Sequence, residues 1–140
     1  MDDLFDYILE MNRQGYCCAQ ILAMAVLDAA GREDNGLVSA LAGLCGGVAW
    51  SGEGTCACLT GGACVLSYFT GKSPEQDEDP RNAKECLWDY LDWFSEKMDG
   101  KLTCLDILNR DMGSRLETCP DLIGESYEKI MEILERRNLI

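Results

Sequence analysis

The residues best able to do chemistry in this chain are its cysteines. The 140-residue sequence contains nine cysteines and no histidine, which excludes Cys-His and Ser-His-Asp catalysis, mixed cysteine-histidine zinc fingers and histidine-ligated haem. Thiolate sulfur is a soft ligand for iron and zinc, and it is also the nucleophile of thiol–disulfide exchange. The cysteine content therefore indicates metal or cluster binding, redox chemistry, or the burial of inert thiols.

Three cysteines directly follow a threonine, at Thr55-Cys56, Thr103-Cys104 and Thr118-Cys119. Threonine is favoured at a helix N-cap, where its hydroxyl accepts a hydrogen bond from a backbone N–H group two or three residues later. Each threonine is therefore predicted to cap a helix whose first residue is the cysteine. The helix dipole and unpaired N–H groups at that position favour thiolate over thiol. The pattern predicts ligating or reactive sulfur at these three cysteines.

The remaining cysteines lack this placement. Cys58 is separated from Cys56 by one residue, and a C-x-C pair is a weaker metal signal than the C-x-x-C motifs that this chain lacks. Structural disulfides are disfavoured, because nine is an odd number and no export signal is evident. Four further cysteines are expected to pack as small hydrophobic side chains: Cys17, Cys45, Cys64 and Cys86.

The charge balance narrows the list of partners and locations. Acidic residues outnumber basic ones, 25 to 12, and the formal net charge is -13, which would repel nucleic acid and anionic lipid headgroups. The opening residues, MDDLFDYILEMNRQ, lack the basic start and compact apolar run of an export signal, so a cytoplasmic location is expected. The uncharged residues 54–71 are interpreted as a buried central helix and not as a membrane span, because they include glycines and threonines.

The elements that must position the cysteines are predicted to be helices. Apolar residues recur at helical spacing and no segment alternates with period two, so the fold class is all-α, with five to seven helices around residues 56–70 in a single domain over 1–140. A glycine-rich turn is expected at 46–54, and Asp79 and Pro80 are expected to start one helix. Helices are expected over residues 4–11, 18–29, 37–48, 56–70, 80–98, 103–108 and from about Pro120 onward.

Five motifs occur in order along nearly the whole chain: GYCCAQ at 15–20, GG at 46–47, GTCACLTG at 54–61, LTCLDIL at 102–108, and Cys119. This order resembles the C-GCAxxG-C-C family of redox-active proteins. The resemblance implies that the four cysteines shared by the family fall on Cys18, Cys56, Cys104 and Cys119. Family members usually have Gly-Ala after the central cysteine, whereas this chain has Ala57-Cys58. Cys58 is therefore a candidate additional ligand.

The resemblance implies a redox-active protein, and we expect a small cytoplasmic one that binds an iron–sulfur or other thiolate-ligated metal centre through these four cysteines, for electron transfer or sensing. The acidic composition would suit a basic redox partner, and a second copy of the chain is another partner to consider. Three alternatives stay open. They are a dithiol–disulfide protein without metal, a structural zinc domain with four cysteine ligands, and a helical domain whose thiols are all inert.

Overall fold

The computed structural model describes residues 2–75 and 83–140, which form seven α-helices and two short 3-10 helices, with no strand among them. The all-α prediction of five to seven helices is confirmed. The expected helix start at Asp79 and Pro80 lies outside the described residues. The α-helices are α1 Asp2–Arg13, α2 Cys18–Ala29, α3 Asn35–Leu41, α4 Ala57–Thr70, α5 Ala83–Lys97, α6 Cys104–Ile107 and α7 Arg115–Arg136, and the 3-10 helices are Ala42–Leu44 and Met112–Ser114.

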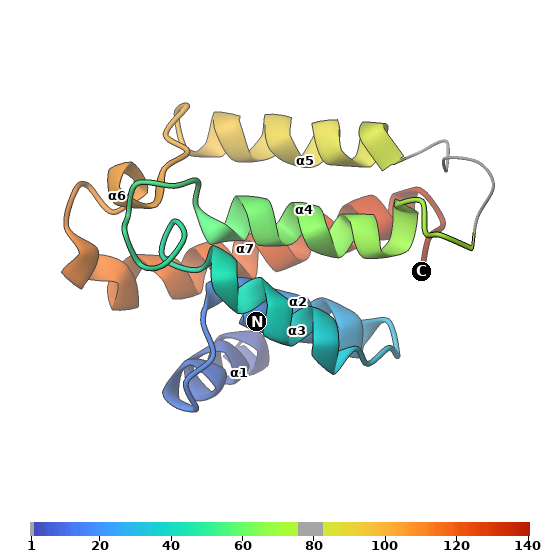
Figure 1. Cartoon of the computed structure of the whole chain (residues 1–140), viewed down its shortest axis with the longest axis horizontal. Helices are drawn as coiled ribbons and strands as arrows, with labels where there is room; N and C mark the ends of the chain where they lie inside the picture. The colour runs from blue at the N-terminus through green and yellow to red at the C-terminus, as the bar shows by residue number, and fades with distance from the viewer. Residues whose placement is uncertain (1, 76–82) are drawn as a thin grey trace.

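The uncharged helix α4 lies at the centre, as predicted, and packs against α2, α5 and α7 (Figure 1). The turn at residues 46–54, the short helix α6 and the beginning of α7 gather at one end of the molecule, on the left of Figure 1. Helix α1 packs mainly on α7. Within the described ranges, no helix combines the length and the apolar character needed to cross a membrane.

Two glycines allow neighbouring helices to approach α4 closely. A Cβ atom on Gly61 would lie 2.7 Å from the Cβ of Ala19 in α2, and a Cβ on Gly62 would overlap the ring of Tyr90 in α5. The fully buried Tyr90 hydroxyl donates a hydrogen bond to the carbonyl of Cys58, over 2.6 Å. The start of α4 is therefore held between α2 and α5.

The Tyr90→Phe substitution is expected to lower the free energy of unfolding by about 1 kcal/mol, because it removes this buried hydrogen bond and keeps the ring. Urea unfolding followed by circular dichroism measures the change. Tyr68→Phe is the matched control, since the Tyr68 hydroxyl makes no hydrogen bond within the described part of the chain. Equal midpoints for the two variants would contradict the assigned role of Tyr90.

Two predicted helix boundaries are wrong. The last helix begins at Arg115, before Pro120, because the turn at Met112–Ser114 leads directly into it. Pro120 therefore lies inside α7, where it cannot donate a hydrogen bond to the preceding turn. Helix α3 ends at Leu41 and a 3-10 turn follows. The expected continuation to residue 48 fails because the backbone turns left-handed from Gly46 onward.

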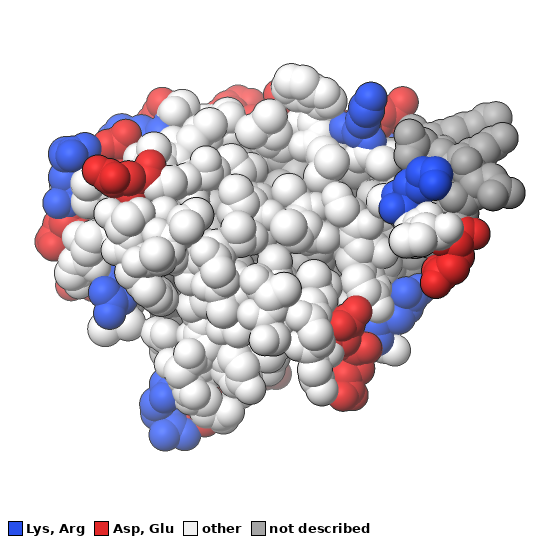
Figure 2. Space-filling model, viewed as in Figure 1, with Lys and Arg blue, Asp and Glu red and all other residues white. Residues whose placement is uncertain are grey.

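Charged side chains are unevenly spread over the face seen in Figure 2. Lysine, arginine, aspartate and glutamate lie mostly at its edges, and its middle, over α3 and α4, is uncharged. The acidic residues visible on this face therefore lie at its edges.

Candidate functional site

An isolated antiparallel bridge joins the second and third cysteine motifs. Thr55 pairs with Thr103. The N–H of Cys56 donates to the carbonyl of Leu102 over 2.7 Å, and the N–H of Cys104 donates to the carbonyl of Gly54 over 2.9 Å. This bridge brings the starts of α4 and α6 together although they are far apart in sequence.

Only one of the three predicted threonine caps is present. Thr103 caps α6 as predicted, because its hydroxyl accepts a hydrogen bond from the N–H of Asp106 at 3.2 Å and Cys104 is the first helical residue. Thr55 is held in the bridge, and Cys56 itself occupies the N-cap position of α4. Thr118 lies inside α7, so the cap predicted there is wrong.

Two glycines bring the turn at residues 46–54 close to Cys104. The N–H of Gly54 donates to the carbonyl of Gly47 over 3.0 Å. A Cβ on Gly47 would lie 2.8 Å from the carbonyl oxygen of Gly54 and 3.0 Å from the Cβ of Cys104. A side chain at position 47 would therefore displace Cys104.

Three thiols form a hydrogen-bonded group, the thiol trio of Cys18, Cys56 and Cys58. Cys18 is the first residue of α2, and Cys58 lies in the first turn of α4. A hydrogen bond from the Cys58 thiol lowers the pKa of Cys18 and that of Cys56, against the opposing effect of burial. Sharing its one proton with these two sulfurs, together with burial, raises the pKa of Cys58 well above its usual value. Cys18 and Cys56 are therefore the sulfurs that most readily become thiolates, and Cys58 keeps its proton.

Cys104 and Cys119 have the opposite tendency. Burial raises both pKa values, that of Cys119 to about 12, and thiolate charge on Cys18 and Cys56 raises them further. The prediction that helix starts favour thiolate at these two positions is wrong. Helix α6 has only four residues and so a weak dipole, and Cys119 is not at a helix start.

The predictions for the other cysteines are confirmed only in part. Cys86 is fully buried, as expected, whereas Cys64 is exposed on α4. Cys17 and Cys45 are buried, but their sulfurs lie at disulfide-bonding distance, with 6.2 Å between the Cα atoms. No local sequence signal distinguishes this pair, since neither residue belongs to a paired cysteine motif.

A small cavity of about 50 Å³, the thiol pocket, reaches Cys18 and Cys119. Its walls include Cys17, Trp50 and Arg115. The guanidinium of Arg115 lies over the Trp50 ring, 5.4 Å from the ring centroid. Its positive charge also opposes, in part, the rise in the pKa of Cys104 and Cys119.

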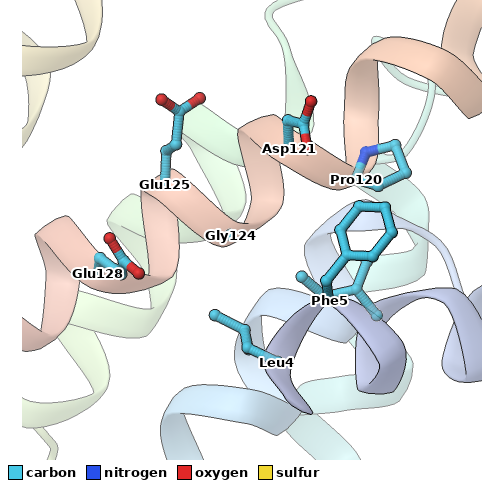
Figure 3. Close-up of a pocket in the computed structure, with 8 residues that line it drawn as sticks. Leu4, Phe5, Pro120, Asp121, Gly124, Glu125 and Glu128 are labelled. Atoms are coloured by element: carbon cyan, nitrogen blue, oxygen red, sulfur yellow. The ribbon is translucent and has the colours of Figure 1, made fainter. Parts of the chain in front are cut away.

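A larger groove of about 290 Å³ lies between α1 and α7. Its apolar wall includes Leu4 and Phe5 on α1, and acidic residues of α7 form its rim, with the carboxylates of Asp121 and Glu125 pointing away from that wall (Figure 3). Ile8 and Pro120 line both this groove and the thiol pocket, so the two hollows adjoin. The acidic residues of the rim are Asp121, Glu125 and Glu128.

Across the described residues, no group of three or more histidine, cysteine, aspartate or glutamate side chains is arranged to hold a metal ion. The ligands of an iron–sulfur cluster have a different requirement, because they bind different iron atoms and do not meet at one point. Cys18, Cys56, Cys104 and Cys119 come from four different helix starts or helices. Four thiols are the donor set that such a cluster takes.

Comparison with known proteins assigns the family. The family model described as "Putative redox-active protein (C_GCAxxG_C_C)" matches residues 16–133, which include all five cysteines of the site. No curated protein and no solved structure matches the chain. Because the family model covers most of the sequence, the chain belongs to the C-GCAxxG-C-C family of redox-active proteins.

Proposed function

We propose that this protein, acting as one domain over residues 1–140, is an electron-transfer protein that binds an iron–sulfur cluster through Cys18, Cys56, Cys104 and Cys119. The main support is geometric, because the backbone bridge brings the segments of Cys56 and Cys104 together and one pocket is lined by both Cys18 and Cys119. Membership of a redox-active family supports the same function. When bound, the cluster would supply one-electron redox chemistry.

The protein's own groups would stabilise the ligand sulfurs. Cys18 and Cys56 favour the thiolate form, which is the form that binds iron. The backbone N–H groups of Cys58 and Leu59 also lower the pKa of Cys56. Hydrogen bonds to sulfur are one factor that sets the potential of a cluster, so Cys58 is suited to tune the site or to serve as an additional ligand.

Purification without oxygen, followed by iron, zinc and acid-labile sulfide analysis and a visible spectrum, tests the cluster. We expect iron and sulfide in comparable amounts and a visible absorption that changes on reduction. Zinc without acid-labile sulfide would indicate a structural zinc site instead of an iron–sulfur cluster. The absence of both metals, in protein made with adequate iron and sulfide, would contradict cluster binding.

The hydrogen bonds of Cys58 favour a second candidate, a dithiol–disulfide protein without metal. A thiolate at Cys18 beside the protonated Cys58 resembles an attacking and a resolving thiol. The Cys18 thiolate would attack a disulfide of the substrate, release one substrate thiol and form a mixed disulfide. Cys58, after giving up its proton, would attack Cys18 and release the second substrate thiol, which leaves a Cys18–Cys58 disulfide. Peptide mass spectrometry of metal-free protein after reaction with an oxidised dithiol would detect that bond, and its absence would exclude this candidate.

The partner would be a basic redox protein in the cytoplasm that docks at the groove between α1 and α7. The groove combines an apolar wall with three carboxylates, and it adjoins the thiol pocket. Complementary charge mainly accelerates encounter between redox proteins and makes the rate sensitive to salt.

Glu128→Lys is expected to slow electron transfer to a basic acceptor protein such as cytochrome c by about fivefold at low salt, because it reverses one charge of the docking rim. Stopped-flow rate constants measured across ionic strength give the effect. Glu33→Lys is the matched control, because Glu33 is also exposed and the change in net charge is identical. Equal slowing by both variants would mean that net charge acts without a local docking site.

A further inference from the structure

The Cys17–Cys45 pair joins two segments that both line or lead to the thiol pocket. Cys17 is the N-cap residue of α2 and directly precedes Cys18. Cys45 follows the 3-10 turn after α3 and precedes the turn at residues 46–54. The other seven cysteines are unpaired. In a reducing compartment a disulfide is usually transient and redox-active, so this pair is a candidate for a redox site separate from the four proposed ligands.

The segment after Cys45 has an unfavourable backbone conformation. Five consecutive residues have positive φ, and three of them are not glycine: Gly46 at 67°, Gly47 at 69°, Val48 at 67°, Ala49 at 55° and Trp50 at 59°. Residues other than glycine rarely adopt this left-handed region, and they persist there only when surrounding contacts hold them. We call residues 46–50 the left-handed turn.

The side chains of the left-handed turn make few contacts that would stabilise it. Val48 is 53% exposed and Trp50 is 52% exposed, so apolar burial contributes little. Hydrogen bonds at its ends do more, because Gly52 N–H donates to Gly46 over 2.8 Å and Gly54 N–H donates to Gly47 over 3.0 Å. The disulfide at Cys45 is the covalent anchor of the same segment. Reduction would remove that anchor and leave only hydrogen bonds, among them Trp50 N–H to the Cys45 carbonyl over 3.2 Å, to hold a conformation that the residues do not favour by themselves.

We propose that Cys17–Cys45 is a redox-active disulfide, and that its reduction by a dithiol releases the left-handed turn from the wall of the thiol pocket. Trp50 connects the two events, because it belongs to the turn and lines the pocket beside Cys17 and Cys119. The expected reductant is a protein or small molecule that carries two thiols.

The exposure of the two residues indicates which sulfur the reductant attacks. Cys17 lines the thiol pocket and is 9% exposed, whereas Cys45 is 1% exposed. A thiolate of the reductant attacks the sulfur of Cys17, forms a mixed disulfide, and displaces Cys45 as a thiolate that takes a proton from solvent. The second thiol of the reductant then displaces Cys17 and closes the oxidised reductant. Two electrons and two protons thereby pass from the dithiol to the cysteine pair.

The surroundings of Cys17 also suit its reduced form. The side-chain oxygen of Gln20 lies 3.4 Å from the sulfur of Cys17 and accepts a hydrogen bond from the Cys17 backbone N–H over 3.2 Å. Gln20 is held in turn by a hydrogen bond from its amide nitrogen to the carbonyl of Val38, over 3.1 Å. A reduced Cys17 thiol would therefore have an acceptor in place.

Two measurements on the full chain test the redox site, whether or not a cluster is bound. Peptide mass spectrometry after alkylation in mixtures of oxidised and reduced dithiothreitol reports the Cys17–Cys45 bond. Hydrogen–deuterium exchange of peptides covering residues 46–54 reports the turn. We expect the bond in oxidised protein and, on its reduction, at least about tenfold faster exchange of the turn amides. Peptides from α5 should exchange at unchanged rates.

Two variants sharpen the test. Cys17→Ser is expected to exchange rapidly at residues 46–54 under both conditions, and Cys64→Ser, the matched control at an exposed unpaired cysteine, should keep the redox response. If Cys17→Ser does not fold, the comparison of oxidised with reduced wild-type protein decides alone. Unlinked cysteines in oxidised protein, or equal exchange in both states, would overturn the proposal. Neither result depends on iron content, so the test of this disulfide is independent of the test of the proposed cluster.

Discussion

Cys56→Ser and Cys104→Ser proteins are expected to contain less than about one tenth of the wild-type iron and sulfide, because loss of even an outer-shell partner commonly weakens a metal site that much. Serine keeps nearly the size of cysteine but lacks the soft, readily ionised sulfur. Each substitution leaves the backbone hydrogen bonds of the bridge that joins α4 and α6 in place. The loss should therefore concern the site and not the fold.

Cys64→Ser is the matched control for this pair. Cys64 lies on the same helix as the trio residue Cys58, but it is exposed, so its replacement should leave iron, sulfide and the visible spectrum unchanged. Far-UV circular dichroism of all three variants separates loss of the cluster from loss of the fold. Full retention of iron and sulfide in folded Cys56→Ser and Cys104→Ser proteins would remove both residues from the ligand set.

Gly61→Ala is expected to lower the free energy of unfolding by about 1–3 kcal/mol, the usual cost of overpacking. The added Cβ would lie 2.7 Å from the Cβ and 3.1 Å from the Cα of Ala19. Since a Cα atom cannot rotate away, α2 must shift relative to α4. Ala19 follows Cys18 directly, so the shift should also separate Cys18 from the other two thiols of the trio. Urea unfolding followed by circular dichroism measures the stability.

Gly43→Ala provides the comparison for Gly61→Ala. A Cβ on Gly43 would have no atom within 4 Å, and its φ is not positive. The substitution should therefore change stability by less than about 0.5 kcal/mol, as is usual for surface positions. Similar urea midpoints for the two variants would show that α2 and α4 can separate at low cost, against the close packing described above.

Several features of this protein follow from its sequence because they depend on neighbouring residues. Helical spacing of apolar residues predicts the all-α fold, and the absence of charge over residues 54–71 predicts the central helix. The cap at Thr103 is likewise local, since its partner is the N–H of Asp106 three residues later. The order of the cysteine and glycine motifs is enough to indicate the family, which the family model confirms.

Other features were decided only by tertiary structure. Cys64 has apolar neighbours in sequence and is exposed, whereas Cys86 directly follows Lys84 and Glu85 and is fully buried, because burial depends on which face of each helix meets the core. The pairing of Cys17 with Cys45 depends on how the end of α3 is placed against the start of α2.

The protonation of the site sulfurs is the clearest case. Local position predicts thiolate at Cys104 and Cys119, but burial and the charges of Cys18 and Cys56 raise both pKa values. Cys58 lowers the pKa of Cys18 through a hydrogen bond between different helices. Burial, through-space charge and interhelical hydrogen bonds come from residues distant along the chain, so only the packed structure determines their sum.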